Sequence, residues 1–175
     1  FGLDYTIVRP HNVIGIRQNI WDKYRNVLGI WMYNYLNGKP IQIYGDGEQQ
    51  RSFTYVQDIM DPLERLGTDP LFSKETINIG SGIPYTLNEL AKIFKATVGD
   101  CEIEYLPARH EVKKAVCSVE KYSDLEVSFT TLQAGMSKMW EWVKVQPPRQ
   151  QKEGPYHEIT KGMYEHWKIN QHDKL

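Results

Sequence analysis

The architecture of this chain can be worked out from residues 38–58, which read Gly38-Lys39-Pro40-Ile41-Gln42-Ile43-Tyr44-Gly45-Asp46-Gly47-Glu48-Gln49-Gln50-Arg51-Ser52-Phe53-Thr54-Tyr55-Val56-Gln57-Asp58. Two short apolar runs, residues 41–44 and 53–56, contain β-branched and aromatic residues, as strands do. Gly45-Asp46-Gly47 lies between them and predicts a turn, because glycine adopts backbone angles that other residues avoid. Arg51 precedes the second run, where its planar fork of donors could grip a phosphate. The same residues, taken alone, also describe a hairpin-like turn with one solvated arginine.

Composition restricts the class of protein and its partners. The 175 residues are 41% hydrophobic and 25% charged, which is typical of a soluble globular protein with one sizeable core. A net charge of -1 predicts neither nucleic-acid binding nor a polybasic membrane patch. No apolar run approaches the ~20 residues that span a bilayer. Cys101 and Cys117 have no metal-ligand spacing, so we expect reduced thiols, a cytoplasmic location and no metal.

The start of the sequence predicts a fragment. The chain opens with Phe1 rather than Met and runs directly into residues 3–9, whose Ile7 and Val8 predict a buried strand. Pro10 cannot donate to a ladder and should end that strand. Because the sequence opens directly into this strand, we expect no signal peptide. Because the chain begins inside a strand, we expect it to be part of a longer protein whose catalytic half lies upstream.

Periodicity and capping residues predict the remaining elements. Two capping boxes, Thr86 with Glu89 and Thr130 with Gln133, mark helix starts, since each hydroxyl can accept from an amide three residues on. Asn37-Gly38 marks a helix end. The predicted helices cover residues 20–36, 86–99, the segment after 58 and the segment from 130 toward Pro147; the predicted strands cover residues 76–80 and 102–106, and a loop is predicted at 67–70.

The motif in residues 38–58 resembles the substrate-binding part of the extended short-chain dehydrogenase/reductases, the NAD-dependent nucleotide-sugar epimerases and dehydratases such as UDP-glucose 4-epimerase. The resemblance covers about residues 4–145 and is carried by four further segments, at residues 10–18, 25–28, 76–80 and 107–112. It implies an α/β fold: the last part of a Rossmann-type parallel sheet followed by a smaller mixed α/β substrate domain. The implied division is residues 1–37 for the rest of the NAD domain, 38–146 for the nucleotide-sugar domain and 147–175 for a polar tail.

The resemblance also implies a set of binding residues. Pro10 and His11 would lie beside the nicotinamide of NAD, with His11 near the chemistry but neither acid nor base. The implied contacts with the nucleotide-diphosphate sugar come from Asn12, Asn26, Leu28, Gln42, Ile43, Tyr44, Arg51, Arg109 and Glu111. In this picture the backbone of residues 42 and 43 meets the edge of the base, Tyr44 packs on the base, and the two arginines hold the diphosphate.

Structural alternatives remain open for several of these residues. Asn26 could be solvated, Tyr44 could be a half-buried strand residue, and Arg109 could form a surface ion pair worth little. His11 could be an ordinary loop histidine. The family writes a proline and a glycine after the second arginine, whereas here His110 replaces that pair and the loop is one residue shorter.

The activity that the resemblance implies is transient oxidation of the sugar at C4 by NAD, in a homodimer. No catalytic residue is expected in this chain. Tyr164 and Lys168 match the Tyr-x-x-x-Lys pair of the superfamily, but they stand in a polar tail, so we interpret the match as chance. Gly80-Ser81-Gly82 lacks a third glycine, and no Gly-x-x-Gly-x-x-Gly occurs. The rival hypothesis is a non-catalytic module that binds a nucleotide sugar or a partner.

Overall fold

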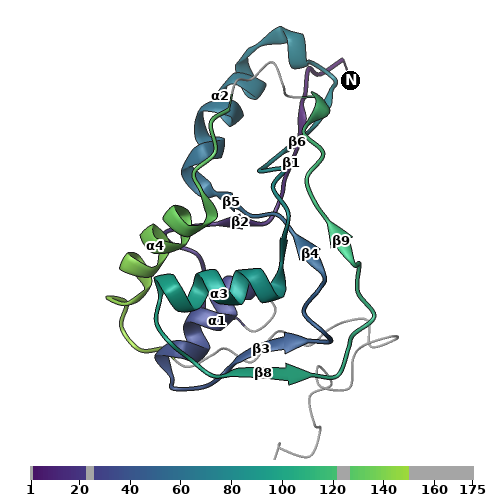
Figure 1. Ribbon diagram of the computed structural model, residues 1–175. Helices are drawn as coiled ribbons and strands as arrows, with labels where there is room; N and C mark the ends of the chain where they lie inside the picture. The colour runs from purple at the N-terminus through teal and green to yellow at the C-terminus, as the bar shows by residue number, and fades with distance from the viewer. Residues whose placement is uncertain (1, 23–25, 122–126, 150–175) are drawn as a thin grey trace, which may run out of the picture.

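The computed structural model describes residues 2–22, 26–121 and 127–149 and shows an α/β fold (Figure 1). The elements follow the order β1 (Ile7–Pro10), β2 (Val13–Ile14), α1 (Val27–Leu36), β3 (Ile41–Tyr44), β4 (Gln50–Arg51), β5 (Thr54–Tyr55), η1 (Val56–Ile59), α2 (Met60–Thr68), η2 (Pro70–Phe72), β6 (Thr76–Ile79), β7 (Tyr85–Thr86), α3 (Leu87–Thr97), β8 (Ile103–Leu106), β9 (Lys114–Ala115) and α4 (Leu132–Val143). The strands predicted around residues 76–80 and 102–106 are confirmed as β6 and β8.

Short sheets, most of them parallel pairs, connect these elements. β1 pairs with β6, β2 with β5 and β3 with β8, each in parallel register. β4 pairs with β7 in antiparallel and with β9 in parallel register. Figure 1 shows β1, β6 and α2 at one end of the molecule and β3 and β8 with α1 and α3 at the other. Parallel pairs require crossover connections, and the intervening helices provide them.

The hairpin interpretation of residues 38–58 is wrong. The first predicted run is β3, which pairs with β8, and the second contains β5, which pairs with β2. β4, between them, pairs with β7 and β9, so the three strands of this stretch belong to three different sheets. The turn between them does need glycine, because Gly45 and Gly47 have φ of 76° and 77°. A Cβ on Gly47 would also overlap the amide of Asn88, which donates to the carbonyl of Asp46. The turn therefore carries the chain from one sheet to the next.

α1 is shorter than predicted because Asn26 caps it. The side-chain oxygen of Asn26 accepts from the amide of Leu28 at 3.1 Å, and the extended backbone of Asn26 (ψ 139°) excludes a helix through this residue. The helix thus begins at Val27 instead of residue 20. Its predicted end is confirmed, since Asn37 is the C-cap and Gly38 has φ of 64°.

The two predicted capping boxes have different outcomes. The box before α3 is confirmed: Thr86 Oγ1 accepts from the Glu89 amide at 3.1 Å, and the Glu89 carboxylate accepts from the Thr86 amide at 2.8 Å. The box before α4 is wrong by one residue, since Thr131 is the cap. Thr130 instead donates through its amide and its hydroxyl to the two carboxylate oxygens of Asp58, both at 2.7 Å.

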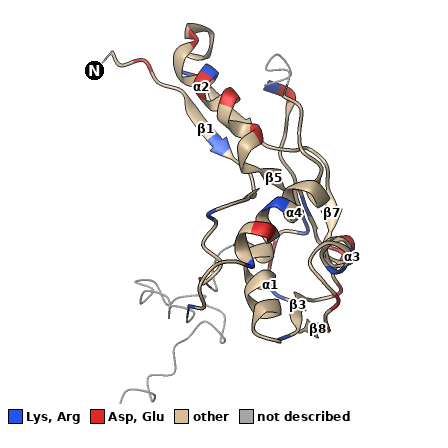
Figure 2. Cartoon of the chain, turned by 90° about the vertical axis from the view of Figure 1, so that its left-hand side faces the viewer, with Lys and Arg blue, Asp and Glu red and all other residues tan. Residues whose placement is uncertain are grey.

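α2 begins after residue 58, as predicted, but it ends later than predicted. It begins at Met60 after the 3-10 turn η1, and Pro62 lies in its first turn, where no amide is needed. It continues through Thr68, so the predicted loop at residues 67–70 begins two residues late. The hydroxyl of Thr68 donates to the carbonyl of Glu64 at 2.9 Å, inside the helix. The charged residues Asp61, Glu64 and Arg65 of α2 are exposed, and Figure 2 marks the acidic and basic positions along the helix in red and blue.

Two clusters of buried side chains form the core. The larger cluster joins α1, β3, α3 and α4, with Trp31, Ile43, Phe94 and Met139 each at most 1% exposed. The smaller cluster lies under α2 and includes the side chain of Ile79. The larger cluster extends across residue 37, so the division predicted there, like that at residue 146, stays a prediction.

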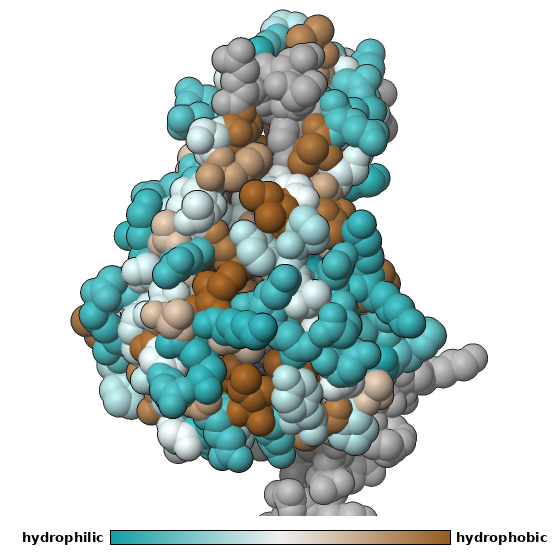
Figure 3. All heavy atoms as spheres, viewed as in Figure 1, coloured by the Kyte–Doolittle hydropathy of each residue, from teal (hydrophilic) through white to brown (hydrophobic). Residues whose placement is uncertain are grey.

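The buried strand predicted at residues 3–9 is wrong in both extent and burial. The strand starts at Ile7, which is 47% exposed, and Leu3 is 75% exposed. Among the described residues β1 pairs only with β6, so its second edge has no partner strand there. Elsewhere on the face shown in Figure 3, hydrophobic residues reach the surface at separate places between hydrophilic ones. None of the described helices is long and apolar enough to cross a membrane.

Candidate functional site

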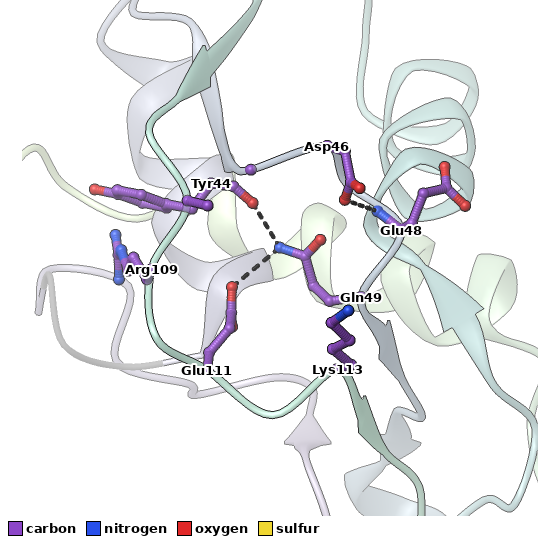
Figure 4. Close-up of a pocket in the computed structure, with 9 residues that line it drawn as sticks. Tyr44, Asp46, Glu48, Gln49, Arg109, Glu111 and Lys113 are labelled. Carbon is purple, nitrogen blue, oxygen red and sulfur yellow. Dashed lines mark hydrogen bonds between the residues drawn. The ribbon is translucent and has the colours of Figure 1, made fainter.

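A cavity of about 270 Å³ opens between the end of β3 and the loop that follows β8 (Figure 4). Its walls come from three short segments around residues 44–46, 48–49 and 108–113. The lining residues are Tyr44, Gly45, Asp46, Glu48, Gln49, Ala108, Arg109, Glu111 and Lys113.

The parallel pairing of β3 with β8 explains why these segments meet. Tyr44 stands opposite Leu106 at the carboxyl ends of the two strands, and the amide of Gly45 donates to the carbonyl of Leu106 at 2.8 Å. The loops that leave both strands therefore start at the same edge. In α/β folds, ligands bind beyond the carboxyl ends of parallel strands.

An arginine–tyrosine contact forms one side of the cavity. The guanidinium carbon of Arg109 lies 3.0 Å from the centroid of the Tyr44 ring. Both side chains are half-buried and both line the cavity. A guanidinium over an aromatic face is a cation–π contact, worth about 0.5–2 kcal/mol. The structure thus places an aromatic platform and a positive charge side by side.

A chain of hydrogen bonds connects this side of the cavity to Arg51. Gln49 donates to the carbonyl of Tyr44 at 2.8 Å and to Oε1 of Glu111 at 3.1 Å (Figure 4). Oε2 of Glu111 accepts from Arg51 at 2.9 Å, and Arg51 also donates to the carbonyl of Gln50 at 2.7 Å. The Arg51 side chain is only 17% exposed, and that of Glu111 is 35% exposed.

The cavity carries charges of both signs. Arg109 and Lys113 contribute positive charge, and Asp46, Glu48 and Glu111 contribute negative charge. Oδ1 of Asp46 accepts from the Glu48 amide at 3.0 Å, which fixes the turn between them. A mixed lining of this kind suits a ligand with anionic groups at one end and hydrogen-bond donors at the other.

A second, larger hollow lies beside α2 but is poorly suited to a ligand site. It has a volume of about 400 Å³ and is lined by Gln57, Asp58, Asp61, Pro62, Arg65, Val127 and Ser128. Both carboxylate oxygens of Asp58 already accept from Thr130.

The predicted site residues Tyr44, Arg109 and Glu111 line the cavity together, and Arg51 joins them through Glu111. Arg51 itself is not part of the lining and reaches the cavity only through its ion pair with Glu111. Whether they share one diphosphate stays a prediction. The Arg109 guanidinium contacts the Tyr44 ring, and this contact does not decide between the binding role and the alternative of a surface ion pair.

Asn12 and His11 lie next to β4, the strand that carries Arg51, and its partner strand β9. The Asn12 amide donates to the carbonyl of Ser52 at 3.0 Å, and Nε2 of His11 lies 3.3 Å from the carbonyl of Ala115. Asn12 has a φ of 40°, which is uncommon for a residue other than glycine. Pro10, the last residue of β1, stands opposite Ile79. The end of β1 therefore reaches the β4–β9 pair, although none of the three predicted residues lines the cavity.

The other predicted contacts belong to the core and to a helix end. Leu28 and Ile43 are fully buried and belong to the larger core cluster. The side chain of Gln42 donates to Glu104 at 2.8 Å, and its carbonyl accepts from the Trp31 indole at 2.9 Å. Asn26 caps α1 and does not line the cavity. Ligand contacts of these residues stay predictions.

Four residues that line the cavity were not predicted from the sequence: Asp46, Glu48, Gln49 and Lys113. Gln49 stands inside the motif of residues 38–58, between the glycine turn and Arg51, and this position was the one available signal. No sequence signal indicated Lys113, because its place in the cavity depends on the path of the loop after β8.

The described residues fit the margin of an NAD site but not its pyrophosphate cradle. Pro10 and His11 stand at the carboxyl end of a parallel strand, where such cofactors bind. The segment that follows contributes Gly15 alone, whereas a dinucleotide site needs a glycine-rich turn at a helix start. The described residues also bring together no group of three or more His, Cys, Asp or Glu that could hold a metal. Cys101 and Cys117 form no disulfide with each other.

Comparisons with known proteins find relatives within one family. Residues 1–80 match the profile of the NAD dependent epimerase/dehydratase family. A UDP-glucose 4-epimerase from Mycolicibacterium smegmatis is 31% identical over 110 residues, which are 62% of this chain and 34% of that protein. Other relatives are decarboxylases of UDP-sugar acids.

Solved structures extend the match. UDP-glucose 4-epimerase from Thermotoga maritima with UDP-glucose is 31% identical with a TM-score of 0.73, over 82% of this chain and 47% of that one. UDP-glucuronic acid 4-epimerase from Bacillus cereus, in complex with UDP-glucuronic acid and NAD, is 26% identical with a TM-score of 0.68, over 79% and 45%. The chain spans about half the length, or less, of the relatives that it matches.

Proposed function

We propose that the cavity of this chain, which belongs to the NAD-dependent epimerase/dehydratase family, binds the nucleoside diphosphate of a nucleotide sugar. The observation that carries the proposal is the meeting of Tyr44, Arg109 and the Arg51–Glu111 pair at the carboxyl end of β3 and β8. An aromatic ring suits a nucleobase, and two guanidinium groups suit a diphosphate.

Ligand binding exchanges contacts that already exist. Arg109 covers the Tyr44 ring in the ligand-free protein. In the proposed complex the base replaces the guanidinium on the ring, and Arg109 turns to the phosphates. The two contacts are of similar strength, because base stacking is worth about 1–3 kcal/mol and the cation–π contact about 0.5–2 kcal/mol, so the new contacts of Arg109 with the phosphates would drive the exchange.

The role of these residues is to hold and orient the substrate. The nucleotide is remote from the reacting sugar carbon, so its binding energy serves to fix the sugar in position. In the whole protein, proposed to be a homodimer and a 4-epimerase or dehydratase, NAD would supply transient oxidation at C4. We assign no acid or base to the described residues, and Tyr164 and Lys168 lie outside them.

Calorimetry tests the proposal with three ligands. UDP-glucose and UDP are expected to bind saturably with one site per chain, while glucose alone gives no saturable heat. An absence of saturable UDP binding up to about millimolar concentration would contradict the proposal. Proton NMR of UDP-glucose incubated with the whole protein and NAD then separates the enzyme from its rival, because a non-catalytic binding module would leave the C4 configuration unchanged.

A further inference from the structure

Gln49 is the most buried polar side chain of the cavity, and the proposed function gives it no task. It is 8% exposed and reaches from the turn after β3 toward the loop after β8. Its Nε2 has two hydrogens, and the carbonyl of Tyr44 and the carboxylate of Glu111 each accept from this nitrogen, at 2.8 and 3.1 Å.

The carboxylate that Gln49 holds is the one that orients Arg51. Glu111 lies between β8 and β9 in a loop, where no ladder fixes its side chain. Its Oε1 accepts a hydrogen bond from Gln49 and its Oε2 accepts one from Arg51, so the two contacts together fix the orientation of the carboxylate. Loss of the first anchor would let a 35% exposed side chain turn into water and release Arg51.

The Gln49 side chain does not hold the turn in place. Its backbone carbonyl accepts from the Leu87 amide at 3.3 Å, and the next amide, of Gln50, donates to Lys113 at 2.7 Å. Asn88 closes over Gly47 on the other side of the turn. Because the backbone is fixed by these contacts, a change of the Gln49 side chain should leave the fold intact.

We propose that Gln49 is a positioning residue that orients Glu111 and, through it, the Arg51 guanidinium for a nucleoside diphosphate. Two of the five N–H donors of Arg51 are used by Glu111 and Gln50. A guanidinium held in this way meets a diphosphate without first losing its side-chain freedom. The inference rests on the proposed function and adds to it the coupling between the Tyr44 end and the Arg51 end of the site.

The test replaces Gln49 by methionine, which keeps the shape and removes both donors. The Gln49→Met chain is expected to bind UDP and inorganic pyrophosphate about tenfold more weakly and uridine equally well, given the strength of hydrogen bonds to charged groups. Gln133→Met on the exposed face of α4 is the matched control and should bind all three ligands like the original chain. Thermal unfolding of both variants should stay close to that of the original chain.

A double-mutant cycle shows whether Gln49 acts through Glu111. In the Glu111→Ala background the Gln49→Met change is expected to have no further effect on UDP binding, because its target is gone. Additive losses, or an equal loss for uridine, would overturn the inference and indicate a general packing role. Unchanged UDP binding by Gln49→Met would overturn it while leaving the proposed function standing; failure of the original chain to bind UDP would overturn both.

Discussion

Replacing Arg51 by alanine removes the guanidinium that Glu111 holds at 2.9 Å beside the cavity. A charge-assisted contact with a phosphate is worth about 1.5–3 kcal/mol, and about 1.4 kcal/mol corresponds to a factor of ten in affinity. We therefore expect the dissociation constant for UDP to rise roughly tenfold to a hundredfold. The same range applies to Arg109→Ala, which also uncovers the Tyr44 ring.

Two further effects of Arg51→Ala can be weighed from the structure. Glu111 loses its partner, but it is 35% exposed and water can solvate it, so the free energy of unfolding should fall by less than about 1 kcal/mol. The unpaired carboxylate would repel a phosphate, which places the expected loss toward the upper end of the range. Arg51→Lys should recover part of the affinity, because an ammonium cannot form the bidentate fork.

Isothermal calorimetry with UDP measures these changes directly. Arg149→Ala is the control: Arg149 is exposed and contacts the ring of Trp21, and neither residue lines the cavity. NAD affinity in the whole protein should be the same for all variants. Equal UDP binding by the Arg51→Ala and Arg149→Ala chains would refute the reasoning and leave Arg51 as a structural partner of Glu111.

Three other changes test the fold and the assignment of function. Gly47→Ala should lower the free energy of unfolding by about 2–3 kcal/mol, because φ at Gly47 is positive and the side-chain amide of Asn88 lies over it. Gly38→Ala, also at positive φ but in open space, should lower it by only about 1 kcal/mol, and equal losses in chemical denaturation would contradict this prediction. Asp58→Ala should lower the free energy of unfolding by about 2 kcal/mol, because its two hydrogen bonds to Thr130, in the segment before α4, are lost. Asp61→Ala, at an exposed position, should lower it by less than about 1 kcal/mol, and a smaller loss for Asp58→Ala than for Asp61→Ala would contradict the role of the Asp58–Thr130 hydrogen bonds. Tyr164→Phe should leave activity of the whole protein within about twofold, and a loss of several hundredfold in a rate assay would make it an acid–base group.

The sequence predicted best where a local rule controlled the outcome. The Thr86–Glu89 box and the Asn37-Gly38 stop were confirmed, because each depends on residues within one turn of the helix. The Thr130 box was wrong by one residue for a reason that is not local: Asp58, far away in the sequence, takes both of its donors.

The site shows the same division between local and long-range information. Tyr44 and Arg51 were found from a contiguous motif, and Arg109 from a matching loop. The sequence could not show that β3 pairs with β8, a strand outside residues 38–58. This pairing brings Glu111, in the loop after β8, between Gln49 and Arg51. The hairpin interpretation was wrong for this reason, since strand pairing depends on partners distant in sequence.

The account predicts where a nucleoside diphosphate binds, and backbone-amide NMR of the chain during a UDP titration measures this most directly. The largest shift changes are expected in residues 44–51 and 108–113, around the cavity at the ends of β3 and β8. Changes concentrated instead on α2 and residues 57–65, beside the second hollow, would contradict the account.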